Sequence, residues 1–248
     1  MWHWIARAAV AAVLFAGTPS GAFAFDASTV EALKTRDAIE WRGIVVSTDR
    51  VTPFYELPGA QPVWVRNGAL TPEGDALFAA ITDAASDGLV SSDYLPLALR
   101  QLDPLAGPAD DVGLELALSS AFLSFARDLH AGRTTPSITD PEIVIARKPA
   151  DPAQWLSMVQ RDGVARTLQR LRPQHTQYFQ LRQLLSGYQA LADRGGWPGV
   201  DQGDVLKPGM NDARVLQLRQ NLMARGYSGI DGGIAPELYD DALVPVVE

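Results

Sequence analysis

Residues 206–227 read Leu-Lys-Pro-Gly-Met-Asn-Asp-Ala-Arg-Val-Leu-Gln-Leu-Arg-Gln-Asn-Leu-Met-Ala-Arg-Gly-Tyr, which is the pattern of one short, capped helix. A turn at 207–209 is followed by Asn211 and Asp212, whose side chains suit a helix N-cap. Gly226 stands where a helix C-cap needs a positive φ. Between the caps, apolar residues recur at helical spacing. These apolar positions are Val215, Leu218 and Leu222, flanked by Leu216 and Met223.

The rest of the chain also has mostly helical periodicity. The longest amphipathic run extends from Gly113 to His130, and Gly132 ends it. Thr71 suits an N-cap, with Pro72 in the first turn of the helix that follows. Further helices are expected at 25–39, 71–88, 97–102, 151–159, 162–171 and 178–192. Extended segments are expected at 54–55, 62–65 and 143–145. The predicted fold class is therefore mainly α with a few short extended segments.

Composition excludes several classes of protein. The 248 residues are 47% hydrophobic and 20% charged, which describes a folded chain with one large domain, or one domain and a small module. The formal net charge of −8 disfavours nucleic acid as a partner, because phosphate backbones repel an acidic chain. The chain contains no cysteine, so it has no thiol chemistry and no thiolate metal site.

The N-terminus has the features of a secretory signal peptide. Arg7 precedes an apolar run over 8–17, and Ala22-Phe23-Ala24 fits the small-x-small cleavage rule. We expect cleavage after Ala24 and a periplasmic or secreted mature protein. A membrane anchor is the alternative, but the apolar run is short for a bilayer. We therefore expect no membrane association after signal removal.

The C-terminal pattern, Leu-Lys-Pro-Gly followed by Asp-x-Arg-Val-x-x-Leu-x-x-x-Leu and Gly-Tyr, resembles the first helix of the small peptidoglycan-binding domain of bacterial cell-wall enzymes. Residues 239–244 resemble the start of its second helix. We expect Pro245 to stop or kink that helix, because an interior proline costs roughly 3 kcal/mol. An incomplete three-helix module of this kind should not bury its apolar face. Residues 211–248 are therefore expected to be marginally stable in isolation.

Four upstream landmarks, in order, resemble the N-terminal scaffold region of large periplasmic L,D-transpeptidases. No landmark is specific alone, but their order and the segment that follows them match over nearly all of the expected mature chain. The resemblance implies a signal peptide at 1–24, a scaffold-like domain at 25–196, a linker at 197–206 and a partial peptidoglycan-binding domain at 207–248. The landmarks are Phe54-Tyr55 with 62–65; 84–94; 125–136; and 171–181 with Tyr188 and 195–198.

The resemblance also implies an activity that this chain cannot perform by itself. Intact relatives are L,D-transpeptidases, whose catalytic domain uses a nucleophilic cysteine to form 3–3 peptidoglycan cross-links. With no cysteine, this chain is expected to be a non-catalytic scaffold and peptidoglycan-binding portion, with peptidoglycan and proteins of wall synthesis as partners. A stand-alone, non-enzymatic wall-binding or partner-binding protein is the alternative. A hydrolase or transferase with an unrecognised site is a third hypothesis.

Other residue types give weak indications of chemistry. His130 and His175 are separated and lack a His-Glu-x-x-His pattern, so neither a metal nor a cofactor is expected. Arg133 is expected to clamp a carboxylate inside the scaffold. Asp83 and Asp87 are expected on an exposed helix face, which is a poor glycosidase arrangement. Ser119-Ser120 lacks the Gly-x-Ser-x-Gly context of a serine nucleophile.

Aromatic residues supply the candidate binding positions. Trp197, Tyr227 and Tyr239 lie at the linker and around the small module, where rings could stack on sugars. The alternative is that these three rings pack the module against the scaffold. Trp41, Trp64 and Trp155 are expected to be core residues.

Overall fold

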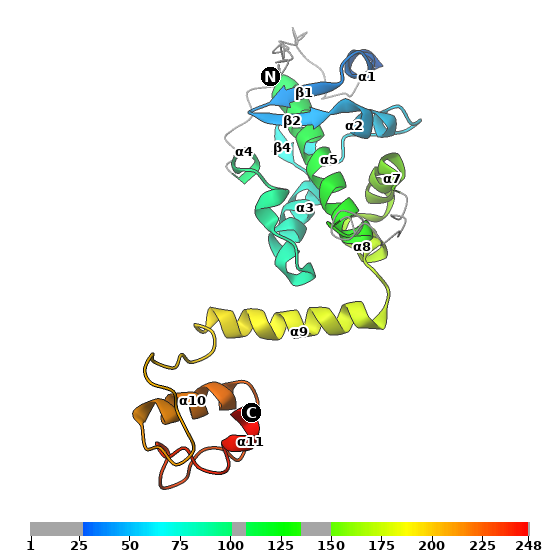
Figure 1. Cartoon of the computed structure of the whole chain (residues 1–248). Helices are drawn as coiled ribbons and strands as arrows, with labels where there is room; N and C mark the ends of the chain where they lie inside the picture. The colour runs from blue at the N-terminus through cyan, green and yellow to red at the C-terminus, as the bar shows by residue number, and fades with distance from the viewer. Residues whose placement is uncertain (1–26, 101–107, 135–149, 248) are drawn as a thin grey trace, which may run out of the picture. The chain divides into compact units, whose positions relative to one another are not determined.

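The computed structural model of the chain describes residues 27–100, 108–134 and 150–247 (Figure 1). The chain divides into two compact units, Met1–Phe179 and Gln180–Glu248. Helices dominate the described residues, and the only sheets among them are two small two-stranded ones. This confirms the mainly α fold class. No described helix is both long and apolar enough to span a bilayer.

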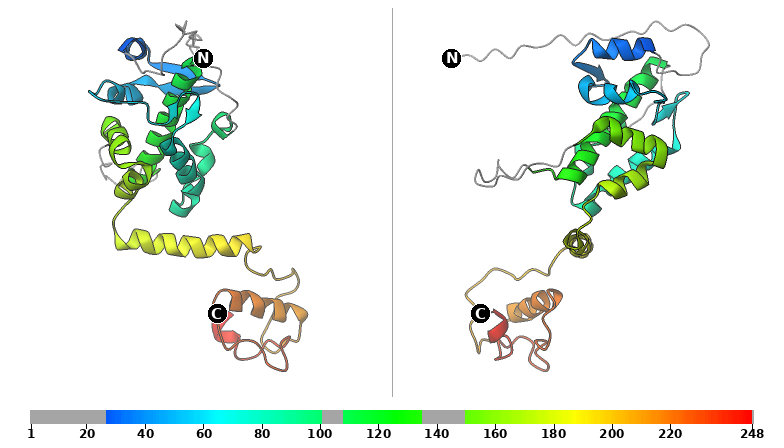
Figure 2. Two further views of the ribbon diagram at one scale, coloured as in Figure 1. Left: turned by 180° about the vertical axis from the view of Figure 1, so that it is seen from behind. Right: turned by 90° about the vertical axis from the view of Figure 1, so that its right-hand side faces the viewer.

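Helix α5 (Pro108–Ala131) is the centre of the first unit, and runs lengthwise through it in every view (Figures 1 and 2). Helices α2, α3, α7 and α8 and both sheets contact it. The predicted apolar stripe is buried, and Gly132 follows the helix with a φ of +79°. Because neighbours surround α5, residues beside the stripe are buried too. The buried apolar side chains of α5 are Leu114, Leu116, Ala117, Leu118, Ala121, Phe122, Leu123, Phe125, Ala126 and Leu129.

Two antiparallel hairpins contribute the extended structure. Strands β1 (Ala38–Trp41) and β2 (Ile44–Ser47) pair with Trp41 opposite Ile44, and β3 (Val65–Arg66) pairs with β4 (Ala69–Leu70). Both hairpins turn through two residues with positive φ, as tight hairpins require. These turn residues are Arg42, Gly43, Asn67 and Gly68.

Two predictions for the N-terminal segment are wrong. Helix α1 covers only Ala27–Lys34, so Ile39 lies in β1 rather than at the end of a helix. Phe54 and Tyr55 are not extended, because they end helix α2 (Thr48–Tyr55). Both aromatic side chains are buried, and tertiary packing of this kind overrides the low helix propensity of a segment that contains two threonines, a valine and a proline.

The next helices follow the predicted pattern. Helix α3 (Pro72–Thr82) is capped by Thr71, whose hydroxyl accepts a hydrogen bond from the Gly74 amide at 3.1 Å, as predicted. It continues as a 3₁₀ turn, η1 (Asp83–Asp87), and ends at Gly88 with a φ of +74°. A second 3₁₀ turn, η2 (Ser91–Asp93), leads to the short helix α4 (Leu97–Arg100).

The end of the first unit is formed by α7 (Pro152–Asp162) and α8 (Val164–Leu171). Both were predicted within a few residues. Gly163 joins them, and α8 has no cap from its own side chains. Glu73 of α3 takes that role by accepting the Val164 amide at 2.8 Å, which ties α3 to α8. The strand expected at 143–145 lies outside the described residues.

The second unit contains most of helix α9 (Thr176–Asp193) and helices α10 (Ala213–Ala224) and α11 (Val244–Val247). Asp212 caps α10 by accepting the Arg214 amide at 2.9 Å, as predicted, and Gly226 has a φ of +98°. The prediction for Pro245 is wrong. It lies in the first turn of α11 rather than at the end of a helix, and a missing N–H costs nothing there.

The C-terminal segment has a small core of its own. Val215, Leu222, Ile230, Tyr239 and Leu243 are buried together, so the expectation that this segment cannot bury its apolar residues is wrong. A buried arginine of α10 holds together the backbone around this core. Its guanidinium donates to the carbonyls of Pro236 at 2.9 Å and Ile230 at 2.7 Å, and it also contacts the Leu238 carbonyl and Asp240. This residue is Arg219, which is fully buried.

Candidate functional site

A buried carboxylate, Glu115 of α5, holds together the first landmark of the sequence. Its two oxygens accept the amides of Val63, Trp64 and Val65 at 2.7–2.9 Å. The hydroxyl of Tyr55 also donates to it at 2.8 Å. The carboxylate therefore satisfies three backbone donors of a segment that enters β3. This is a structural role, and it leaves no oxygen of Glu115 facing solvent.

The bonds around Glu115 form a directed chain. The Trp64 indole can only donate, so Ser119 accepts its N–H at 2.8 Å. With Glu115 ionised, the Ser119 hydroxyl donates to Tyr55, and Tyr55 donates to the carboxylate. Burial raises the pKa of Glu115 to about 7, although the four donors favour its ionised form. Ser119 is thus occupied in the core and is not available as a nucleophile.

A second buried carboxylate joins the second and fourth landmarks. Arg172 donates to Asp87 through Nε at 3.0 Å and Nη2 at 2.8 Å, and the Tyr178 hydroxyl donates at 2.6 Å. The side chain of Asp87 is only 1% exposed, which corrects the expectation of an exposed face. Asp83 instead accepts from the Ser86 hydroxyl. The two carboxylates are therefore engaged separately and do not form a catalytic pair.

The remaining polar candidates also have structural partners. Arg133 forms an ion pair with Asp93, as the carboxylate-clamp interpretation predicted. The His130 ring lies against Trp155 and its Nδ1 is 3.3 Å from the Leu171 carbonyl oxygen. His175 is exposed at the start of α9. Among the described residues, no group of three or more potential ligands could hold a metal ion.

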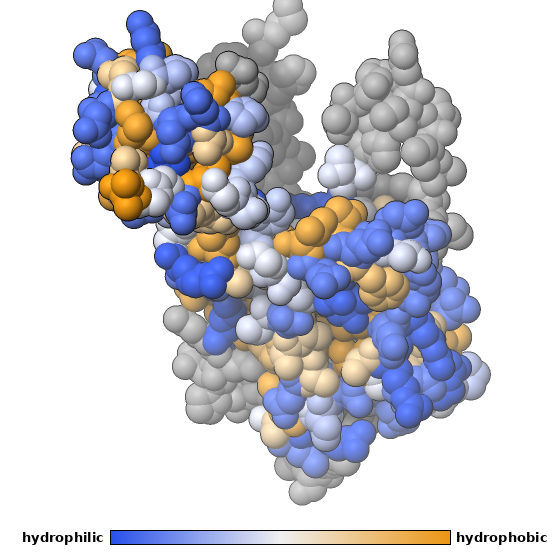
Figure 3. Space-filling model, turned by 90° about the horizontal axis from the view of Figure 1, so that it is seen from below, coloured by the Kyte–Doolittle hydropathy of each residue, from blue (hydrophilic) through white to orange (hydrophobic). Residues whose placement is uncertain are grey.

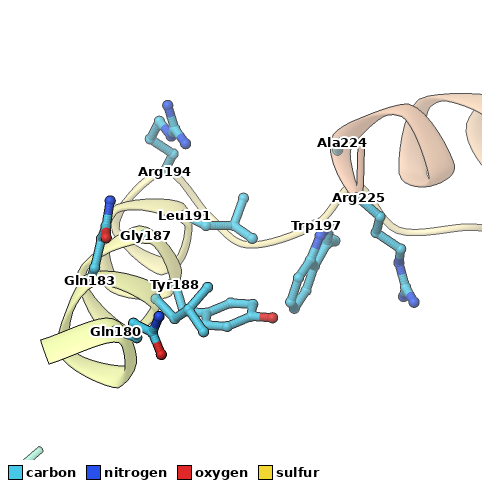
Figure 4. A pocket seen from close by; sticks show the side chains of 10 residues that line it. Gln180, Gln183, Gly187, Tyr188, Leu191, Arg194, Trp197, Ala224 and Arg225 are labelled. Atoms are coloured by element: carbon cyan, nitrogen blue, oxygen red, sulfur yellow. The ribbon is translucent and has the colours of Figure 1, made fainter. Parts of the chain in front are cut away.

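The second unit has a hollow of about 1040 Å³ lined by α9, the segment after it and the end of α10. The rings of Tyr188 and Trp197 lie edge-to-face next to each other in its lining, with centroids 5.9 Å apart (Figure 4). Arg225 lies on the other side of Trp197, with its guanidinium carbon 5.3 Å from the ring centroid. Arg194 extends from the end of α9. The space-filling view shows other apolar groups exposed among polar ones (Figure 3).

Hydrogen bonds hold the segment that carries Trp197 against α10. Asn221 donates to the Pro198 carbonyl at 2.6 Å. Gln217 and Asp201 exchange two hydrogen bonds, each 2.8 Å long. The two α10 residues that make these bonds, Asn221 and Gln217, do not line the hollow. They therefore fix the segment without filling the hollow. Trp197 is thereby positioned while 41% of its surface stays exposed.

The three predicted binding residues differ in their exposure to solvent. Trp197 lines the hollow and Tyr227 is 48% exposed, so both rings can meet a ligand. Tyr239 is only 6% exposed and belongs to the small core, where its backbone pairs with Gly209 and Met210. Its ring cannot stack on a sugar. Tyr239 therefore packs, as the alternative interpretation held, but within its own unit.

Sequence reasoning missed three lining residues, Tyr188, Arg194 and Arg225. Tyr188 was noted only as part of a landmark, and neither arginine was singled out. A signal was present, because α9 has no buried residue although its apolar residues fall on one face. An apolar helical face with nothing to cover it indicates a surface used for contact.

The fold and its polar contacts define a mostly helical scaffold built on one central helix. The chain matches the family described as Scaffold domain over residues 49–185, more than half of its length. The chain therefore belongs to the Scaffold domain family. Comparison with curated proteins and with solved structures found no match.

Proposed function

We propose that this chain is the non-catalytic scaffold and peptidoglycan-binding portion of an L,D-transpeptidase-like cell-wall protein. The Scaffold domain at 49–185 and the order of the sequence landmarks support this proposal. The signal-like segment at 1–24 supports export to the periplasm. Intact members of that family would form 3–3 cross-links, and this chain would bring such a transpeptidase activity to the cell wall.

The observation that best supports wall binding is the exposure of aromatic rings in the second unit. Tyr188 and Trp197 line the hollow, and the two residues stay 57% and 41% exposed. Flat apolar rings with nearby polar groups suit polymers of sugar and peptide, because the ring covers C–H surface while amides and guanidinium groups make hydrogen bonds. Gln180 and Gln183 supply such amides beside the rings.

The proposal that the chain itself catalyses nothing rests on its residues. It has no cysteine to supply the thiolate that the family chemistry requires. The other candidates are used structurally, since Asp87 is neutralised by Arg172 and Ser119 is tied to Trp64 and Tyr55. Incubation with purified sacculi should therefore release no soluble muropeptides, as measured by chromatography.

Co-sedimentation with purified sacculi tests the binding function. The chain from residue 25 onward should pellet with sacculi, and the Tyr188→Ala/Trp197→Ala double variant should stay largely in the supernatant. Phe179→Ala is the matched control, because Phe179 is also an exposed aromatic residue of α9 but does not line the hollow. Failure of the unmodified chain to pellet would remove the proposal.

The alternative, a stand-alone partner-binding protein, has one observation in its favour. Leu181, Leu184 and Tyr188 on α9 are all more than half exposed, which is unusual for large apolar side chains on one helix. Sacculi stripped of attached proteins by protease distinguish the two functions. Retention on stripped sacculi supports direct wall binding, whereas retention only on unstripped sacculi supports a protein partner.

A further inference from the structure

We propose that the hollow recognises the carboxylates of peptidoglycan stem peptides, through Arg225 with help from Arg194, rather than the sugars alone. This inference rests on the proposed wall-binding function and names the part of the polymer that the site reads. The stem peptides are the acidic part of the polymer, whereas the sugars linked in the glycan backbone present hydroxyl and amide groups. The two parts can be distinguished by charge.

The charges around the hollow favour an anion. Its lining includes two arginines and no aspartate or glutamate. This is a local reversal in a chain with a formal net charge of −8. Within the described part of the chain, neither Arg194 nor Arg225 has a carboxylate partner. Two guanidinium groups without a carboxylate partner, beside an open space lined by both polar and apolar side chains, suit a ligand that is both anionic and partly apolar.

The contact between Arg225 and Trp197 prepares the arginine for a carboxylate. The guanidinium lies over the indole ring, with its central carbon 5.3 Å from the ring centroid. The N–H donors of arginine point outward in the plane of the guanidinium, so a contact through its face leaves them available. Such a fork matches the two oxygens of a carboxylate. Restricting the side chain beforehand lowers the entropy lost on binding.

A simpler role for both arginines is to complement the helix dipole, since Arg225 follows α10 and Arg194 follows α9. That role uses only the positive charge, and it would be served equally by lysine. The carboxylate site uses the geometry of the fork as well. The two roles therefore predict different results for a lysine substitution.

The test uses sacculi whose free amines are acetylated and whose carboxyl groups are then converted to primary amides by carbodiimide with excess ammonium. The control material receives the same treatment without carbodiimide. We expect the chain to bind the control sacculi at least about tenfold more tightly than the amidated ones, the ratio expected for one charge-assisted contact. Arg225→Ala should show the same loss on control sacculi, and Arg225→Lys should recover only part of it.

Arg66→Ala is the matched control variant, because Arg66 is an exposed arginine of the first unit. It should bind as the unmodified chain does. Equal binding to amidated and control sacculi would overturn this inference while leaving the wall-binding function intact. Arg225→Ala or Arg225→Lys indistinguishable from the unmodified chain would also overturn it. Absence of binding to either material would instead overturn the wall-binding function itself.

Discussion

Two buried charged residues, Glu115 and Arg219, form hydrogen bonds with backbone groups outside their own helices. Glu115 accepts three amides from 63–65, and Arg219 donates to carbonyls at Ile230, Pro236 and Leu238. Sequence reasoning found neither, because a charge inside a helix is ordinarily solvated. A signal for Glu115 was present, since the residues beside it, Leu114, Leu116 and Leu118, are apolar. A charge in a helix that is buried all round must find its partners inside the protein.

Replacement of Glu115 by glutamine should destabilise the first unit strongly. The amide group can accept at only one of its two ends, so one or two backbone N–H groups lose their acceptor, at a cost of about 1–3 kcal/mol each. We expect a loss of about 2–5 kcal/mol in the free energy of unfolding, measured with urea. Glu31→Gln on the exposed face of α1 is the matched control and should change it by less than about 0.5 kcal/mol. Equal effects of the two changes would contradict this account of Glu115.

Glu115 should also make stability depend on pH. Its folded pKa of about 7 lies above its ordinary value of 4.5. Between these values the folded state holds a proton that the unfolded state has released, so the free energy of unfolding falls as pH rises. The loss attributable to Glu115 is on the order of 3 kcal/mol from pH 4.5 to pH 7. Urea unfolding at several pH values should show this decline, and Glu115→Gln should flatten it. A rise in stability across that interval would contradict it.

At the scale of elements, capping residues and hydrophobic periodicity were sufficient to predict most of the helices. Thr71, Asp212 and Gly132 were placed correctly because each acts through its own backbone neighbours. Phe54-Tyr55 was assigned as extended because its helical state depends on packing against distant segments. Pro245 was misread for a related reason, since its effect depends on whether it stands in the first turn or the interior of a helix.

The fold of the C-terminal segment depends on the hydrogen bonds of Arg219. Arg219→Met removes its hydrogen bonds to three carbonyls and its ion pair with Asp240, and the carbonyls of Ile230 and Pro236 lose their donor. We expect hydrogen exchange to become fast from Ala213 to Leu243, with α5 unchanged. Arg194→Met is the matched control, because Arg194 is exposed. If the amides of α10 stay protected from hydrogen exchange in Arg219→Met, the small core forms without the arginine, which would contradict this account.

At the scale of the whole molecule, the two units have separate apolar cores. One cluster surrounds α5 and the other contains Val215, Leu222, Ile230, Tyr239 and Leu243. A core of five residues stabilises far less than one several times larger. Heating should therefore unfold the second unit first, in a separate calorimetric transition that Arg219→Met lowers and Glu115→Gln leaves in place. A single transition moved by both variants would show that the units unfold together.

The candidate site could be predicted only in part. Trp197 lines the hollow as a predicted aromatic residue near the linker, whereas Tyr227 is exposed but is not among the lining residues. Tyr239 has the same type and spacing, and only the small core shows that it is buried. Arg225 acquires its role from its position over Trp197, which no local pattern reveals. Contacts between segments distant in sequence decided each of these cases.

The most direct measurement is co-sedimentation of the chain from residue 25 onward with protease-stripped sacculi, with Tyr188→Ala/Trp197→Ala and Phe179→Ala alongside. The account predicts that the unmodified chain and Phe179→Ala pellet with the sacculi and that the double variant does not. If all three proteins stay in the supernatant, or all three pellet equally, the exposed rings of the second unit are not a wall-binding site.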